Sequence, residues 1–196
     1  GVVGRVSAVL ADATTGEIID SSDGNEPLPP ASVTKVVTAL YALEYLGPDF
    51  QFETRVFADG PILDGVLVGN LILEGGGNPN LLTDDLAQLA TRLKDSGLTA
   101  VRGKFYVYDG ALPNLDEIDE SQLDQSGYNP AISGLNLNFN RVHFEWQREG
   151  GAYTVMLDAR SINFRPAVTV AKMRIVDRSV PVYTYRDGGG LDEWTV

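Results

Sequence analysis

The sequence predicts an α+β fold in which a short hairpin and a helix precede a mixed segment that becomes mostly β. Three observations support this prediction. An apolar helical stretch begins near residue 32, a strand–helix–strand pattern occupies residues 66–108, and alternating polar and apolar runs follow Ile132. Apolar residues make up 43% of the 196 and charged residues 21%, which is typical of a globular protein.

The charge and composition exclude several classes of function. Lys and Arg number 15 against 27 Asp and Glu, so the formal net charge of −12 makes nucleic acid an unexpected partner. No apolar run approaches the ~20 residues that span a bilayer, so we expect no transmembrane segment, and the N-terminus lacks a signal-peptide layout. The chain has no cysteine and a single histidine, His143, which disfavours thiol chemistry, histidine triads and metal clusters.

The N-terminal elements are a hairpin and one helix. Residues Val6–Leu10 and Glu17–Asp20 are β-leaning runs, and the segment between them carries Asp12 and Gly16, which suit a turn. A helix is predicted from about Ser32, after a proline-rich segment, to Leu46, before Gly47-Pro48. Apolar residues cover most of its circumference, so we expect this helix to be buried in a core.

The next block predicts a βαβ unit. Strands are expected at Val66–Leu73 and Val101–Tyr108, with a helix between them that Thr83 caps. The glycine-rich connection Gly75–Leu81 has neither the G-x-G-x-x-G spacing nor the lysine of a phosphate-binding loop. We interpret it as a structural turn.

The second half of the chain contains an acidic loop followed by strands. Residues 114–124 carry five carboxylates in a spacing that matches no known calcium loop, so we interpret them as a solvated acidic loop. Alternating runs from Ile132 onward predict antiparallel strands with one solvated face. His143 is interpreted as a packing or surface residue of these strands. Trp146 and Trp194 are interpreted as core or edge aromatic residues, with a sugar-binding platform as the alternative.

The pattern Ser32-Val-Thr-Lys35 is the candidate catalytic constellation. The serine lies in the first turn of the most apolar helix, where unpaired N–H groups and the helix dipole favour negative charge. The lysine follows one turn later on the same face. In apolar surroundings desolvation would disfavour its ammonium form, as a general base for a serine hydroxyl requires. The alternative is that Lys35 extends to solvent and has no chemical role.

The motifs around this pattern resemble those of the serine penicillin-binding enzymes, whose signature begins with S-x-x-K. Four further segments resemble the D-alanyl-D-alanine carboxypeptidase/endopeptidase branch, the class C low-molecular-mass penicillin-binding proteins, in which a long insertion follows S-x-x-K. These segments are Phe52-Glu-Thr-Arg-Val56, Gly69-Asn-Leu-Ile-Leu-Glu-Gly-Gly-Gly-Asn-Pro-Asn-Leu81, Gly103-Lys-Phe-Tyr-Val-Tyr-Asp109 and Tyr128-Asn-Pro-Ala-Ile-Ser-Gly-Leu135.

The resemblance implies a serine peptidase acting on peptidoglycan. Ser32 would attack the carbonyl of a D-Ala-D-Ala stem peptide, Lys35 would take its proton, and water would hydrolyse the acyl-enzyme. β-Lactams would acylate the same serine, and no cofactor or metal is implied. The location implied is periplasmic or extracytoplasmic, with the signal peptide already absent.

Two elements of the family's site are not found in this sequence. No K-[TS]-G motif occurs, and Ser161-Ile162-Asn163 matches S-x-N only by coincidence, since it lies in the insertion-like region. We therefore expect an N-terminal portion of a longer enzyme, completed by a C-terminal remainder of the same protein. Residues 1–54 would begin an incomplete β-lactamase/transpeptidase-like domain, and residues 55–196 would form an inserted mixed, mostly β domain.

Asp124 is a candidate substrate-binding residue. Its place before Tyr128-Asn-Pro is similar to that of an acidic residue which, in some relatives, meets the amino group of the stem peptide's diamino acid. The alternative is one more solvated carboxylate. For the whole protein, the alternatives are a β-lactamase or esterase on the same scaffold, or a non-catalytic binding module.

Overall fold

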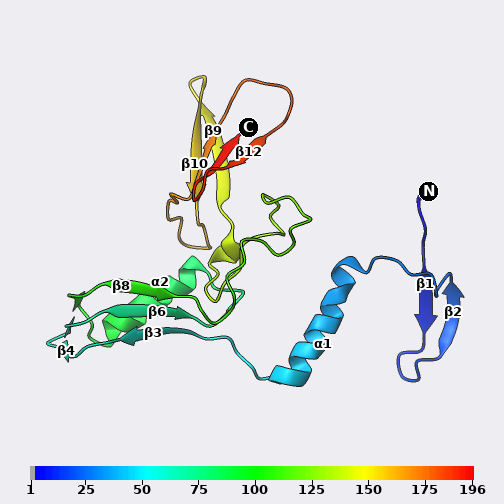
Figure 1. The fold of residues 1–196 in the computed structure, drawn as a ribbon, viewed down its shortest axis with the longest axis horizontal. Coiled ribbons are helices and arrows are strands. Elements are labelled where there is room, and N and C mark those ends of the chain that lie inside the picture. Colours follow the sequence, from blue (N-terminus) through cyan, green and yellow to red (C-terminus); the bar gives the residue numbers. More distant parts are fainter. Residues whose placement is uncertain (1–2) are drawn as a thin grey trace. The chain divides into compact units, whose positions relative to one another are not determined.

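The computed structural model describes residues 3–196 (Figure 1). They divide into two compact units, with the division between Gln51 and Phe52. The division lies close to the predicted boundary at residue 54. Among residues 3–196, no helix is long and apolar enough to cross a membrane.

The first unit contains the predicted hairpin and helix, and a 3₁₀ turn that was not predicted precedes the helix. Its elements are β1 (Ala8–Ala11), β2 (Ile18–Ser22), η1 (Ala31–Val33) and α1 (Thr34–Leu46). The strands pair antiparallel, and the Asp12 carboxylate accepts the N–H groups of Thr14 and Thr15 at 2.8 Å, which closes the turn between them. The helix ends at Gly47, whose φ of 82° leaves the helical region.

The expectation that α1 is buried is wrong for the described residues. No residue of α1 is buried, and Val36, Val37 and Leu40 are each about two-thirds exposed. The physical reason is that the unit offers only a two-stranded hairpin besides the helix, which is too little structure to form a second layer over an apolar circumference.

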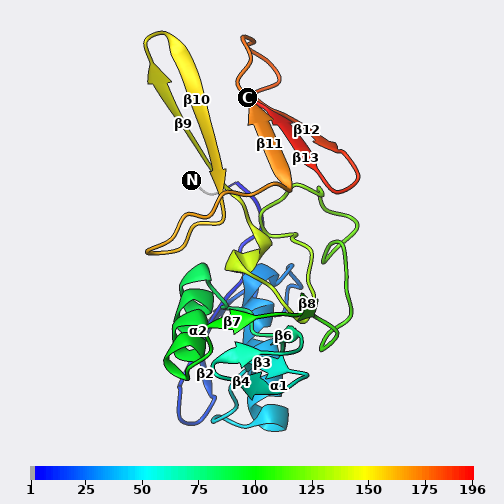
Figure 2. The ribbon, with the colours of Figure 1, turned by 90° about the vertical axis from the view of Figure 1, so that its left-hand side faces the viewer.

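The second unit begins with two small sheets and one helix. Its first elements are β3 (Thr54–Ala58), β4 (Ile62–Leu63), β5 (Val66–Leu67), β6 (Leu71–Gly75), α2 (Thr83–Asp95), β7 (Ala100–Val101) and β8 (Phe105–Tyr108). The sheets have the orders β3-β6-β8 and β4-β5-β7. Strand β6 pairs parallel with β8, and β5 with β7, so the predicted βαβ unit is confirmed. Figure 2 shows α2 beside these strands.

Two details of the predicted βαβ unit are wrong. Each expected strand is divided in two, at Gly69-Asn70 and at Gly103, where the backbones approach so closely that a Cβ on Gly103 would lie 2.2 Å from the Gly69 carbonyl oxygen. Thr83 is the first helical residue and not the N-cap; its N–H is capped by the Asn138 side chain at 3.1 Å.

The glycine-rich connection after β6 forms a close backbone contact. The Gly77 N–H donates to the Gly134 carbonyl at 2.7 Å, and a Cβ on Gly75 would lie 2.5 Å from the same oxygen. The glycine-rich connection therefore has the structural role that the sequence indicated, since a larger residue would push the two backbone segments apart.

The rest of the unit is mostly β, with η2 at its start. Its elements are η2 (Asn138–Asn140), β9 (His143–Glu149), β10 (Ala152–Asp158), β11 (Ala171–Arg174), β12 (Thr184–Asp187) and β13 (Asp192–Thr195). The hairpin β9–β10 and the pair β12–β13 are antiparallel, as expected. The pairing of β11 with β13 is parallel, which corrects the all-antiparallel prediction.

The alternating run from Leu135 is not a strand until His143. Asn138 is buried, 7% exposed, and its amide donates to Thr83 Oγ1 and to the Ala159 carbonyl, both at 2.9 Å. A backbone turn at Asn138 brings these groups together, which a continuous strand would prevent. The side chain thus joins the start of α2 to the segment after β10.

An ion cluster holds the base of the β9–β10 hairpin. Arg160 donates to both carboxylate oxygens of Asp158 at 2.8 Å and to Glu145 Oε2 at 2.7 Å. These hydrogen bonds, from a charged donor, lower the pKa of Asp158 and the pKa of Glu145 below their ordinary values. Asp158 is 6% exposed, so its charge depends on Arg160.

We expect Arg160→Met to lower the midpoint of thermal unfolding by several degrees at pH 7, because it leaves the buried Asp158 charge without a partner. Both carboxyl pKa values are lowered by folding, so their contribution is present above the unfolded values near ~4 and is lost as pH falls. The difference between variant and wild type should therefore shrink below about pH 4.

The matched control is Arg165→Met, which removes a more exposed arginine 3.8 Å from the same Glu145. It should leave the midpoint nearly unchanged. Equal effects of the two variants, measured by circular dichroism, would contradict the role of Arg160.

Candidate active site

Ser32 and Lys35 are brought together at the start of α1. Lys35 Nζ donates a hydrogen bond to Ser32 Oγ at 2.8 Å. This separation is within the range that a general base needs to take a proton from a nucleophile. The predicted juxtaposition of the two side chains on one helical face is therefore present.

The local backbone explains why the serine is at the beginning of the helix. Ser32 belongs to the 3₁₀ turn Ala31–Val33, which is closed by a hydrogen bond from the Val33 N–H to the Pro30 carbonyl at 3.0 Å. Pro30 can precede this turn because it needs no N–H partner. The dipole of α1 favours negative charge near its N-terminus, where Ser32 lies. The first turn of α1 contains no acidic residue whose charge would counteract this effect.

The expected burial of Lys35 is wrong for the described residues. Its side chain is exposed, as are those of its neighbours along the helix. The cause is the same as for α1 as a whole, since no second layer lies over this face within the unit. The hydrogen bond to Ser32 is present without the apolar surroundings that the sequence indicated.

The S-x-N match at Ser161–Asn163 is part of the packing around α2. Asn163 Nδ2 donates to Asp84 Oδ1 at 2.6 Å, which ties the segment to the first turn of that helix. The interpretation of this match as coincidental agrees with such a structural use.

The acidic loop is organised by one buried side chain. Asn129, 2% exposed, accepts the N–H groups of Ile118 and Asp119 at 2.9 Å and donates to Glu117 Oε2 at 3.0 Å. Two of the loop's acidic residues are therefore engaged in shaping the loop. Within residues 3–196, no group of three or more His, Asp or Glu side chains is arranged to hold a metal ion.

Asp124 lies on this loop and lines a hollow of about 870 Å³ in the second unit. The apolar part of the wall comes from the strands and includes Phe144, Leu157, Met173 and Trp194. The charged part consists of one arginine, Arg141, and the carboxylates of Asp116, Glu117, Asp124, Asp187 and Asp192. The excess of carboxylates gives the hollow a negative potential, which favours a cationic group.

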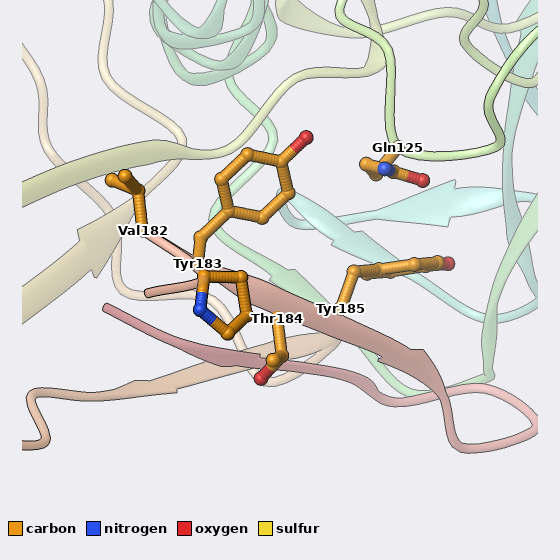
Figure 3. A pocket seen from close by; sticks show the side chains of 6 residues that line it. Gln125, Val182, Tyr183, Thr184 and Tyr185 are labelled. Atoms are coloured by element: carbon orange, nitrogen blue, oxygen red, sulfur yellow. The ribbon is translucent and has the colours of Figure 1, made fainter. Parts of the chain in front are cut away.

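A second, more open hollow of about 630 Å³ shares Gln125 and Tyr185 with the first. In Figure 3 the rings of Tyr183 and Tyr185 extend toward the side where Gln125 lies, while Val182 and Thr184 point away from it. Trp194 packs against both rings, with centroid separations of 5.9 and 4.8 Å. Trp194 also lines the first hollow, so the ring of Tyr185, which lines both, is packed against its wall.

The hollow contains functional candidates that the sequence did not indicate. Tyr185 Oη donates to Asp192 Oδ1 at 3.0 Å. Burial, followed by this bond and by the charges of Asp192, Asp187 and Asp124, raises the pKa of Tyr185 to about 12. No local motif links the loop around Asp124 to strands some 60 residues later, so only the tertiary structure could bring these residues together.

Comparison with solved structures defines the class of fold. The crystal structure of penicillin binding protein 4 (dacB) from Haemophilus influenzae matches 94% of this chain with a TM-score of 0.67 and 22% identity. The same protein complexed with a novel β-lactam matches 98% of the chain with a TM-score of 0.62. The fold is therefore that of a penicillin-binding protein of this type, which confirms the predicted α+β class.

The family is defined by sequence. Residues 2–185 match the model of the D-Ala-D-Ala carboxypeptidase 3 (S13) family, and the chain belongs to this family. A D-alanyl-D-alanine carboxypeptidase of Actinomadura sp. (strain R39) is 43% identical over 137 residues, which cover 68% of this chain. The D-alanyl-D-alanine carboxypeptidase DacB of Haemophilus influenzae is 35% identical over 99 residues, or 50% of the chain.

The chain corresponds to only part of these relatives. The matched segments cover 26% of the Actinomadura protein and 21% of DacB, and the structural match covers 42% of penicillin binding protein 4.

Burial is the largest cause of the raised pKa of Tyr185, and the hydrogen bond to Asp192 and the charge of that carboxylate add to it. We expect Asp192→Asn to lower this pKa from about 12 part of the way toward its ordinary value, because the variant weakens the hydrogen bond and removes the charge while burial remains. NMR of ¹³C-labelled tyrosine during an alkaline titration measures this. Folding raises this pKa, so the stability contributed by Tyr185 is present below the unfolded value of about 10 and is lost as pH rises toward the folded value.

Asp187→Asn is the matched control for this titration, since Asp187 acts on Tyr185 through its charge. It should lower the pKa of Tyr185 less than Asp192→Asn does. The reverse order would contradict the assigned hydrogen bond.

Proposed function

We propose that this chain carries the nucleophile and general base of a serine D-Ala-D-Ala carboxypeptidase. The observation that carries the proposal is the 2.8 Å approach of Lys35 Nζ to Ser32 Oγ at the N-terminus of a helix, in a chain of the D-Ala-D-Ala carboxypeptidase 3 family. The pair needs neither a histidine nor a metal to activate the serine.

The reaction follows from this geometry in two stages. The neutral amine of Lys35 takes the proton of Ser32 Oγ as the oxygen bonds to the carbonyl carbon of the penultimate D-Ala. The bond from that carbon to the terminal D-Ala nitrogen then breaks, and the leaving amine receives the proton. Water later attacks the acyl-enzyme ester, which releases the shortened peptide and restores the Ser32 hydroxyl. The same steps on a peptide cross-link would give endopeptidase activity.

A further segment of the same protein is proposed to complete the site. The family's K-[TS]-G element does not occur in these 196 residues, and the S-x-N match is engaged with Asp84. The matched relatives are longer, and the exposed apolar side chains of α1 provide a surface on which such a segment can pack. It would supply the substrate-carboxylate contacts and an oxyanion hole.

β-Lactams are proposed to acylate Ser32, since a cyclic amide presented to the nucleophile gives an acyl-enzyme from which the amine cannot leave. A β-lactam complex of the structurally similar penicillin binding protein 4 supports this. The location proposed is extracytoplasmic, where peptidoglycan is found.

Asp124 is proposed to bind the amino group of the stem peptide's diamino acid. The negative hollow that it lines supports this role, because the wall combines carboxylates for an ammonium group with apolar side chains for the carbon stem.

The nucleophile is tested by labelling the full-length protein with a fluorescent penicillin. We expect Ser32→Ala to abolish labelling, and Lys35→Ala to slow it about 100-fold or more, since a general base contributes that much. Ser7→Ala, which removes another serine of the same unit, should label as the wild type does. Undiminished labelling of Ser32→Ala would remove Ser32 from the mechanism, and sustained β-lactam hydrolysis would indicate a β-lactamase.

The role of Asp124 is tested with a D-Ala-D-Ala peptide whose diamino acid has a free side-chain amine. We expect Asp124→Asn to raise KM for this peptide about tenfold, as loss of a charge-assisted hydrogen bond implies, and to leave KM for the N-acetylated peptide unchanged. Asp95→Asn, the same change on α2 outside the hollow, should alter neither value. Equal effects on both peptides would exclude an amine contact.

A further inference from the structure

The backbone immediately before Ser32 has an unusual conformation. Ala31 has a φ of 45°, in the left-handed region that residues with a Cβ seldom adopt. Among the described residues 3–196, most of the other non-glycine residues with positive φ are Asp or Asn, whose short polar side chains tolerate this region. They are Asp23, Asp64, Asn138 and Asn140, with Phe139 as an exception.

The left-handed φ changes the direction of the chain at the point where the helix begins. Pro30 is right-handed, with φ −73° and ψ −18°, so the sign of φ reverses between Pro30 and Ala31. The reversal lies within the turn that the Val33 N–H closes on the Pro30 carbonyl, and the Thr34 N–H donates to the carbonyls of Ala31 and Ser32. Ser32 is therefore fixed from both sides.

This reversal has a consequence for access to the serine. If residue 31 continued the helical conformation toward the N-terminus, the preceding residues would coil over the first turn of α1 and Ser32 would be an interior helical residue. Because Ala31 departs from helical φ, Ser32 lies in the short 3₁₀ turn that leads into α1, three residues before Lys35. Ser32 is an exposed residue, and its Oγ contacts Lys35 Nζ.

We propose that Ala31 is a positioning residue for Ser32: its left-handed backbone directs the serine side chain toward Lys35 and keeps the hydroxyl open to substrate. This inference rests on the proposed function. Alanine suits the position because its methyl group is the smallest side chain that restricts the backbone, whereas glycine would also permit other conformations.

The proposal predicts that tolerance for positive φ, and not side-chain size, decides activity. Asparagine and leucine have side chains of the same branching and nearly the same size, but only asparagine enters the left-handed region readily. In the full-length protein, Ala31→Asn and Ala31→Gly should retain the acylation rate by fluorescent penicillin to within about threefold, whereas Ala31→Leu should lose about tenfold or more.

The loss in Ala31→Leu should be in the acylation rate constant and not in the dissociation constant of the preceding non-covalent complex, because the misplaced group is the nucleophile. If the role of Ala31 were purely structural, Ala31→Leu would lower thermal stability and leave the acylation rate constant of the folded protein unchanged. Should Ala31→Leu fail to fold, Ala31→Asn still tests the proposal, since a tenfold loss in that variant overturns it.

Equal rates for Ala31→Leu and Ala31→Asn would also overturn the proposal. Ser32→Ala separates this failure from that of the proposed function. If Ser32→Ala is unlabelled while Ala31→Leu acylates at the wild-type rate, only the role of Ala31 is lost. If Ser32→Ala labels fully, the proposed function itself is wrong.

Discussion

The contact between Lys35 Nζ and Ser32 Oγ is the interaction on which the proposed chemistry depends. It is a local contact, because Ser32 in the 3₁₀ turn and Lys35 in the first turn of α1 are only three residues apart along continuous helical backbone. Its geometry therefore requires only that α1 forms and begins at the right residue. The proline-rich segment and the 3₁₀ turn determine that beginning, and Gly47 determines the end.

The second unit is held together by polar groups as much as by apolar ones. Among residues 3–196, the buried apolar side chains are Leu67, Leu73 and Leu81, and the buried polar side chains are Asn129, Asn138 and Asp158. Each of the three polar groups has hydrogen-bond partners, which offset the cost of burial. These contacts join segments that no sheet ladder connects, such as the start of α2 and the residue after β10. The acidic loop and its hollow are maintained in this way.

The sequence predicted the elements whose signals are local. The hairpin, α1, the βαβ unit and the Ser32–Lys35 pair follow from periodicity, turn residues and three-residue spacing, all of which act within one element. Features that depend on distant partners could not be predicted. The parallel pairing of β11 with β13, the turn at Asn138 and the surroundings of Asp124 arise from contacts between segments far apart in sequence. The prediction that α1 is buried was wrong for a related reason. An apolar sequence pattern indicates that a helix needs a packing partner, but it does not show whether the same segment of chain contains that partner.

Helix α1 carries both exposed apolar side chains and the proposed general base, Lys35. A short helix and a two-stranded hairpin have little stability alone, so tertiary packing must provide most of it. The apolar side chains that need this packing belong to the same helix as Lys35. A segment that covers them would therefore pack on the helix that carries the proposed general base. Under the proposed function, the stability of α1 and the completion of the site would then depend on the same packing.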